Sequence, residues 1–145
     1  GGLPAGWAAA AGRGPGAAGR RAPRPTHAGP NLVMHMNDTT VTFPLQPDAV
    51  QGLRDSIAAV RGEFERAAEA GAQRVKLESM DYEQKPEAEG EVALEAFCNP
   101  NGFPNALVAS VLVTLKTRDG IKVVSETKLT QLQDDVEQYL ETYGF

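Results

Sequence analysis

The first 30 residues contain almost nothing that could build a hydrophobic core. Eight Gly, five Pro and nine Ala occupy 22 of these 30 positions. Glycine and proline interrupt helices and strands, and alanine buries too little apolar surface to offset the entropy lost on ordering. The chain therefore divides into an N-terminal arm, residues 1–30, and a body, residues 31–145, which must hold the whole core as a single domain. We expect the arm to be disordered or held by a partner.

Charge separates the same two parts. The arm carries four Arg and no acidic residue, whereas the body carries ten of the 14 basic residues and all 19 acidic ones. The formal net charge of −5 is thus +4 on the arm and −9 on the body. Because an acidic body repels nucleic acid, only the arm is expected to contact RNA or an acidic surface.

An Arg-bearing, Ala-rich and acid-free N-terminus is typical of an organellar transit peptide. We expect the arm to be such a peptide or its remnant, with a mature low-complexity arm and a cloning or gene-prediction artefact as alternatives. Its richness in Gly, Ala and Pro favours the chloroplast over the mitochondrion. Residue 1 is Gly and not Met, which suggests a processed form or a fragment. If the arm docks on a partner, its candidate contacts are Trp7, Arg20 and Arg21.

Two segments of the body have the spacing of amphipathic helices. The first begins at Pro47 and ends before Gly71, and the second starts near residue 129. In the second, Thr130 and Gln133 are placed to form a capping box. The apolar positions, spaced three and four apart, are Val50, Leu53, Ile57, Val60 and Phe64 in the first helix and Leu129, Leu132, Val136, Tyr139 and Tyr143 in the second.

The remaining segments of the body are predicted to be strands. Alternating apolar residues indicate a hairpin that turns at Asn37 and Asp38, and a second hairpin turns at Asp119 and Gly120. The nearly continuous apolar run at residues 107–115 predicts a central strand that is covered on both faces. The predicted strands are residues 32–36, 41–45, 74–82, 91–98, 107–115 and 121–126, with an acidic loop at 83–91.

This order of elements predicts an α+β domain, ββα-ββ-ββα. We expect an antiparallel or mixed sheet of about six strands with both helices on one face. Residues 32–70 and 112–145 match at an offset of 79 or 80, which predicts a ββα unit used twice. The alternative is a chance likeness between two amphipathic hairpin-plus-helix segments.

Catalytic side chains are scarce in the body. Its one thiol, Cys98, and its one imidazole, His35, both lie in predicted strands, where each is expected to be a packing residue and not half of a catalytic pair. Asp134 and Asp135 are explained by the dipole of the last helix. The sequence shows neither a phosphate-binding glycine loop nor a calcium-binding carboxylate pattern. We therefore expect no catalytic residue, no metal site and no cofactor.

These features favour a non-enzymatic accessory protein of an organelle. We expect a small peripheral subunit or assembly factor of a larger protein complex, such as a photosynthetic complex. Two alternatives are a small-ligand-binding or enzymatic α+β domain, and an organellar ribosome-associated protein that uses its basic arm. No apolar run is long enough to span a membrane. The candidate partner contacts in the body are Phe103, presented on the loop 99–105, and Tyr143, at the tip of the last helix.

Overall fold

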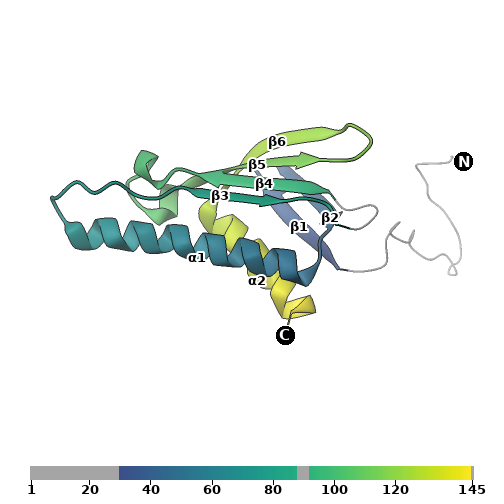
Figure 1. Ribbon diagram of the computed structural model, residues 1–145, viewed down its shortest axis with the longest axis horizontal. Coiled ribbons are helices and arrows are strands. Elements are labelled where there is room, and N and C mark those ends of the chain that lie inside the picture. Colours follow the sequence, from purple (N-terminus) through teal and green to yellow (C-terminus); the bar gives the residue numbers. More distant parts are fainter. Residues whose placement is uncertain (1–29, 88–91, 145) are drawn as a thin grey trace, which may run out of the picture.

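The computed structural model describes residues 30–87 and 92–144, so nearly all of the N-terminal arm lies outside the described residues. The elements follow the predicted order ββα-ββ-ββα and form an α+β fold (Figure 1). The strands are β1 (Asn31–Met36), β2 (Thr39–Pro44), β3 (Met80–Gln84), β4 (Ala93–Cys98), β5 (Ser110–Lys116) and β6 (Lys122–Lys128). The helices are α1 (Pro47–Ala70) and α2 (Leu129–Tyr143), with short 3-10 turns η1 (Pro100–Gly102) and η2 (Ala106–Val108).

The strands form two antiparallel sheets, so the prediction of a single sheet of about six strands is wrong. Among the described strands, β1 pairs only with β2, and β3, β4, β5 and β6 pair in that order in a second sheet. β1 lies beside β6, but side chains join the two strands. Thr127 Oγ1 donates to the His35 carbonyl at 2.8 Å, and Asn37 Nδ2 donates to Ser125 Oγ at 3.2 Å. The hydroxyl of Thr127 thus binds the His35 carbonyl, which would otherwise accept a hydrogen bond from a backbone N–H of β6 if the two strands were paired.

Helix α1 begins and ends where the sequence predicts. Proline suits the first turn because the N–H that it lacks would have no helical partner, and Gly71 adopts a φ of 63°, which glycine tolerates. A helix of 24 residues is about 36 Å long, whereas a strand of seven residues spans about 23 Å. The C-terminal end of α1 therefore extends beyond the sheet (Figure 1).

The segment 74–79, predicted to begin the third strand, has no regular secondary structure and pairs with none of the described strands. Its backbone binds side chains instead. Arg66 of α1 donates to the Lys76 carbonyl at 2.6 Å. The amide of Asn101 binds both the N–H and the carbonyl of Leu77, at 2.9 and 2.8 Å, as a strand partner would. Because these side chains satisfy the backbone, β3 begins only after the segment ends.

The main core lies between the two helices and the sheet of β3 to β6. α1 packs on β3 and on α2, and α2 also packs on β1. All predicted seam residues of the helices are buried except Tyr143, which is 39% exposed. Two tyrosine hydroxyls donate to backbone carbonyls inside this core: Tyr82 to Ala49 at 2.6 Å, and Tyr139 to Leu45. Burial raises the pKa of Tyr82 to about 12.

The predicted capping box at the start of α2 is wrong. Lys128 is the N-cap residue and makes no side-chain cap, so Thr130 and Gln133 both lie inside the helix. The N–H of Leu129 instead donates to the carbonyl of Ala109, just before β5, at 2.9 Å. A backbone bond from a neighbouring segment thus satisfies one of the free N–H groups of the helix start.

The repeat of residues 32–70 and 112–145 stays a prediction. Both segments hold a hairpin and a helix, and at an offset of 79 four of the five seam positions are buried in both helices, the exception being Phe64 and Tyr143. The first strands are also in phase at 79, since Leu32 and Val111 are both completely buried. At the offset of 80, buried Leu32 would correspond to Leu112, which is 42% exposed.

Candidate functional site

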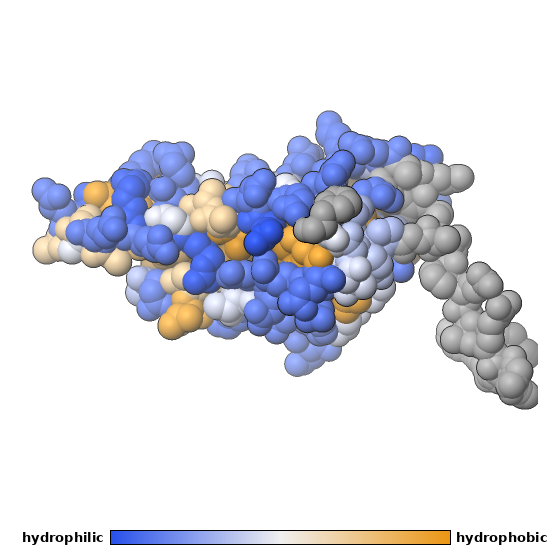
Figure 2. All heavy atoms as spheres, turned by 90° about the horizontal axis from the view of Figure 1, so that it is seen from below, coloured by the Kyte–Doolittle hydropathy of each residue, from blue (hydrophilic) through white to orange (hydrophobic). Residues whose placement is uncertain are grey.

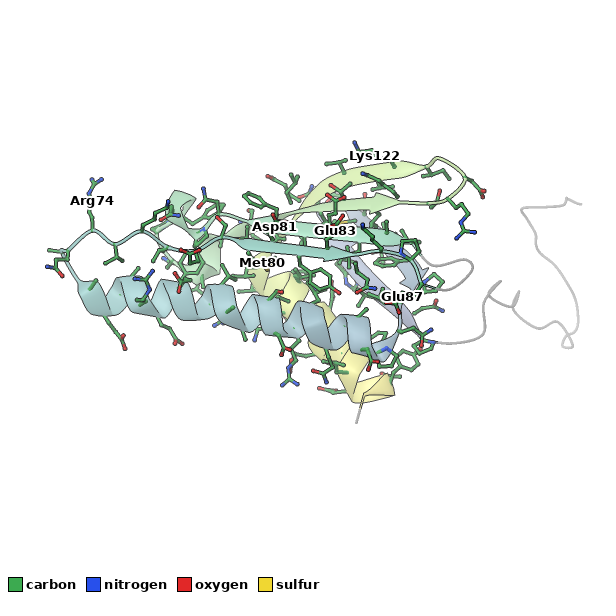
Figure 3. The ribbon with its side chains drawn as sticks, in the orientation of Figure 1. Arg74, Met80, Asp81, Glu83, Glu87 and Lys122 are labelled. Atoms are coloured by element: carbon green, nitrogen blue, oxygen red, sulfur yellow. The ribbon has the colours of Figure 1, made fainter. Side chains whose placement is uncertain are left out.

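Among residues 30–87 and 92–144, no helix lies over one face of the sheet of β3 to β6. Both helices lie on the opposite side (Figure 1), and on β3 the side chain of Met80 points toward α1 while Asp81 and Glu83 point away (Figure 3). We call the uncovered surface the outer face; none of its residues is buried. It consists of Asp81 and Glu83 of β3, Ala93, Glu95 and Phe97 of β4, Ser110, Leu112, Thr114 and Lys116 of β5, and Lys122, Val124, Glu126 and Lys128 of β6.

Three large apolar side chains lie near the centre of the outer face. Phe97 and Leu112 are directly opposite each other on β4 and β5, and Val124 of β6 is diagonal to Leu112. They are 43%, 42% and 52% exposed. The prediction that this part of β5 is covered on both faces is therefore wrong. Its physical reason is that α1 and α2 supply a cover for one side of the sheet only.

Charged residues flank this apolar centre. Asp81 and Glu83 make the edge strand β3 acidic, while Lys116 and Lys122 are paired across β5 and β6 (Figure 3 labels both acids and Lys122). Between these two sides, Lys116 Nζ lies 3.6 Å from a carboxylate oxygen of Glu95. The outer face is thus apolar in the middle, acidic along β3 and basic near the β5–β6 turn.

A second candidate site is a groove of about 310 Å³ between β1 and α2. At its base, the ring nitrogen Nδ1 of His35 lies 2.8 Å from Oδ1 of Asp135. The backbone N–H of His35 donates to Oδ2 of the same carboxylate, also at 2.8 Å. Gln131 Nε2 also donates to Oδ1, at 3.0 Å. The Asp135 side chain is only 5% exposed, whereas the His35 side chain is 51% exposed. The groove is lined by Asn31, Val33, His35, Asp135, Gln138, Tyr139, Thr142 and Tyr143.

The interpretation of Asp135 from the helix dipole alone is incomplete. Its carboxylate is buried and accepts three hydrogen bonds. The sequence holds a signal for this burial, because Asp135 follows Leu132 by three positions and precedes Tyr139 by four, which places it on the apolar stripe of α2. A carboxylate on a buried stripe needs a partner, but the partner lies 100 residues away along the chain.

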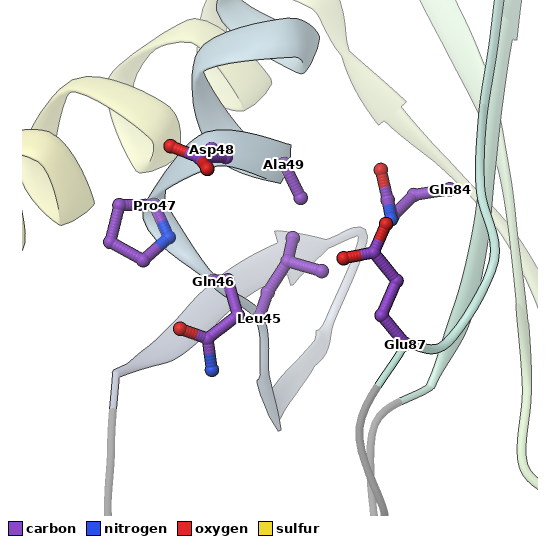
Figure 4. Close-up of a pocket in the computed structure, with 7 residues that line it drawn as sticks. All are labelled: Leu45, Gln46, Pro47, Asp48, Ala49, Gln84 and Glu87. Carbon is purple, nitrogen blue, oxygen red and sulfur yellow. The ribbon is translucent and has the colours of Figure 1, made fainter.

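A third cavity, of about 370 Å³, lies at the start of α1 (Figure 4). Residues 45–49 form one side of it, and Gln84 and Glu87 form the other. The lining includes two carboxylates, those of Asp48 and Glu87. Asp48 is in the first turn of α1, where it complements the positive end of the helix dipole, so this arrangement has a structural explanation.

A fourth hollow, of about 350 Å³, follows the seam between α1 and α2. Seen from the side of the helices, hydrophobic patches are separated by hydrophilic side chains (Figure 2). Polar groups bridge the seam: Arg61 Nη1 donates to Gln133 Oε1 at 2.8 Å, and Arg54 Nε lies 3.3 Å from Glu137. Because these rim groups bind each other, the hollow is explained by helix packing.

The structure keeps Cys98 and His35 apart, in different sheets. Cys98 is 1% exposed on the inner face of β4, and burial raises the pKa of its thiol, which disfavours the reactive thiolate. The imidazole of His35 binds Asp135 instead. These two residues therefore do not form a nucleophile and base pair.

The predicted partner contacts are divided between different parts of the molecule. Phe103 is partly buried and packs against the core next to η1, and Tyr143 lines the groove between β1 and α2. Trp7, Arg20 and Arg21 lie outside the described residues. The roles of all five as partner contacts stay predictions. The sequence does not reveal the outer face, because the alternation along β4 to β6 does not tell which side of the sheet a helix covers.

Within residues 30–87 and 92–144, no three His, Cys, Asp or Glu residues are grouped to hold a metal ion. In the same part of the chain, neither helix combines the length and the apolarity needed to cross a membrane. Comparisons of the chain with protein-family models, with curated proteins and with solved structures found no match.

Proposed function

We propose that this chain is a non-enzymatic accessory protein that binds a partner protein through the outer face. The observation that carries the proposal is the cluster of Phe97, Leu112 and Val124, adjacent on three strands and 42–52% exposed. Contiguous exposed apolar side chains surrounded by polar ones mark interaction surfaces. Aromatic anchors near the centre of such a surface commonly supply most of the binding energy.

The dimensions of the outer face suit one helix of a partner. Four strands about 4.8 Å apart are about 14 Å across, and a helix with its side chains is about 10–12 Å wide. A matching helix would carry an apolar stripe for Phe97 and Leu112. It would place basic residues toward Asp81 and Glu83 and acidic residues toward Lys122.

The composition and charge of the N-terminal arm support the proposal that the protein is imported into an organelle. The arm's +4 charge, its lack of acidic residues and its Ala, Gly and Pro content support import, with the chloroplast favoured over the mitochondrion. Within that compartment the body would be a peripheral subunit or assembly factor of a protein complex, such as a photosynthetic complex. Fusing residues 1–30 to a fluorescent protein tests the import step. Fluorescence confined to the cytosol in plant cells would contradict it.

The docking step is tested with matched variants of the full chain, expressed with an affinity tag in the source cells. Leu112→Glu places a charge in the centre of the outer face, and Ile121→Glu places the same charge on an apolar residue in the β5–β6 turn, 62% exposed. We expect proteins recovered with the wild type to be lost from Leu112→Glu and retained by Ile121→Glu. Equal recovery from both variants, or recovery only as a free monomer of about 15.4 kDa, would contradict the proposal. Equal urea midpoints would show that both variants are folded.

A further inference from the structure

The groove between β1 and α2 holds a histidine whose position is fixed from several sides. The backbone N–H of His35 donates to Asp135, and its carbonyl accepts from Thr127, which is 4% exposed. The ring is held by the same carboxylate, which Gln131 also binds. A side chain held in this way keeps its orientation without a ligand, which lowers the entropy lost on binding one.

The contact with Asp135 also determines which nitrogen of His35 is free. A carboxylate accepts hydrogen bonds and cannot donate them, so Nδ1 carries the proton in the bond to Oδ1. In the neutral ring, Nε2 is then left with a lone pair. Among the described residues, none hydrogen-bonds Nε2, and the side chain is 51% exposed where it lines the groove. With a neutral His35 ring, the groove therefore contains an oriented hydrogen-bond acceptor.

Apart from His35 and Asp135, the residues that line the groove are apolar, aromatic or polar without charge. Val33 and Tyr143 are 41% and 39% exposed, and the ring of Tyr143 lies 4.9 Å from that of Tyr139, tilted by 55°. Among the described residues the lining contains no Lys or Arg, and its carboxylate, that of Asp135, already accepts three hydrogen bonds. An anion would find no permanent positive charge here. The volume, about 310 Å³, is at the lower end of the range for small-molecule sites.

We infer that this groove is a binding site for a small neutral aromatic molecule that carries a hydroxyl group. The hydroxyl donates to Nε2 of His35, and the ring packs between Val33 and Tyr143. Asp135 is a positioning residue, since it holds the imidazole and its proton on the side away from the ligand. β1 and α2 form the site and contribute no residue to the outer face, so the inference does not rest on the proposed docking function.

Phenol is the probe, and benzene and benzoate are its matched controls. In a ¹⁵N-labelled sample of the full chain, the ring nitrogens of His35 are expected to show a protonated Nδ1 and an unprotonated Nε2 before any addition. Phenol is expected to bind with a Kd on the order of 1 mM, as befits a single ring, and to shift the Nε2 resonance and the amides of Val33 and Tyr143. Benzene, which lacks the hydroxyl, and benzoate, which is an anion, are each expected to bind at least about fivefold more weakly.

Two variants separate binding from folding. His35→Phe removes the acceptor and is expected to weaken phenol binding about tenfold. Because that change also removes the bond to Asp135, Tyr143→Ala serves as the second variant; it shortens an exposed wall and is expected to weaken binding about fivefold. Leu112→Ala, on the outer face, is expected to bind phenol as the wild type does. A His35 ring that carries a proton on Nε2, in the neutral or the cationic form, would overturn the inference. So would phenol affinity unchanged in both groove variants, or the absence of any shift at about 10 mM phenol.

Discussion

The two faces of the sheet of β3 to β6 use the same strands and similar residues in opposite environments. Leu94 of β4 and Val113 of β5 are completely buried on the inner face. On the outer face of the same two strands, Phe97 and Leu112 are 43% and 42% exposed. A strand with apolar residues on both sides needs a cover on each side, and α1 and α2 cover only one. An apolar run therefore predicts burial only where the rest of the chain can reach it.

The largest difference between the two faces is expected in stability. Leu94→Ala removes a fully buried side chain and should lower the free energy of unfolding by about 2–5 kcal/mol. Leu112→Ala, the same substitution on the outer face, should change it by less than about 1 kcal/mol, because the side chain already contacts water. Urea unfolding followed by circular dichroism measures both. Equal losses would show that the outer face is covered in the free protein.

A thiol on each face gives the next largest contrast. Cys98 is 1% exposed and burial raises its pKa, so it should react with a thiol reagent such as DTNB only when the core opens. Phe97→Cys, made in a Cys98→Ala background, should react at least about 100-fold faster, since it points to the outer face. Similar rates for the wild type and the variant would contradict the assignment of the two faces.

A smaller effect is expected from Tyr82 of β3, on the stability of the protein in alkaline solution. Tyr82 faces the core, and its pKa of about 12 lies above the ordinary value of 10.0. Above pH 10 the unfolded chain loses this proton while the folded chain retains it, so stability should fall as pH rises from 10 toward 12. Below pH 10 the hydroxyl adds no pH dependence. Urea midpoints between pH 9 and pH 12 measure the effect.

Two tyrosine variants provide the control for this pH range. In Tyr82→Phe, stability should fall less steeply between pH 10 and pH 12 than in the wild type. Its free energy of unfolding should be lower by about 1 kcal/mol, because the hydrogen bond to the Ala49 carbonyl is missing. Tyr143→Phe changes a residue that is 39% exposed and should follow the wild type. If the decline is the same in Tyr82→Phe as in the wild type, burial of this hydroxyl is not its cause.

Local signals in the sequence predict the helices and both hairpins well. Pro47 and Gly71 fix the ends of α1, and Asn37, with a φ of 53°, and Gly120, with a φ of 104°, lie in the two turns. The start of β3 could not be predicted, because it depends on hydrogen bonds from Asn101, which lies 24 residues away from the carbonyl it binds. Long-range hydrogen bonds leave no trace in local periodicity.

The same limit applies to the sites. His35 and Asp135 are 100 residues apart in the chain, and only the packing of α2 on β1 brings them together. The alternation of residues along β5 predicts that Leu112 and Val113 face opposite ways, but it cannot assign the helices to one side. The apolar outer face therefore becomes visible only when the positions of α1 and α2 are known.

Photo-crosslinking at the outer face tests whether a partner protein covers it. A benzophenone amino acid replaces Leu112 in the full chain, and in a control chain it replaces Glu69, an exposed residue of α1. After irradiation in an extract of the source cells, we expect one crosslinked protein from position 112 and none in common from position 69. Excess wild-type chain should suppress this product, and excess Leu112→Glu chain should not. Identical products from both positions, or a product that both competitors suppress equally, would contradict the claim.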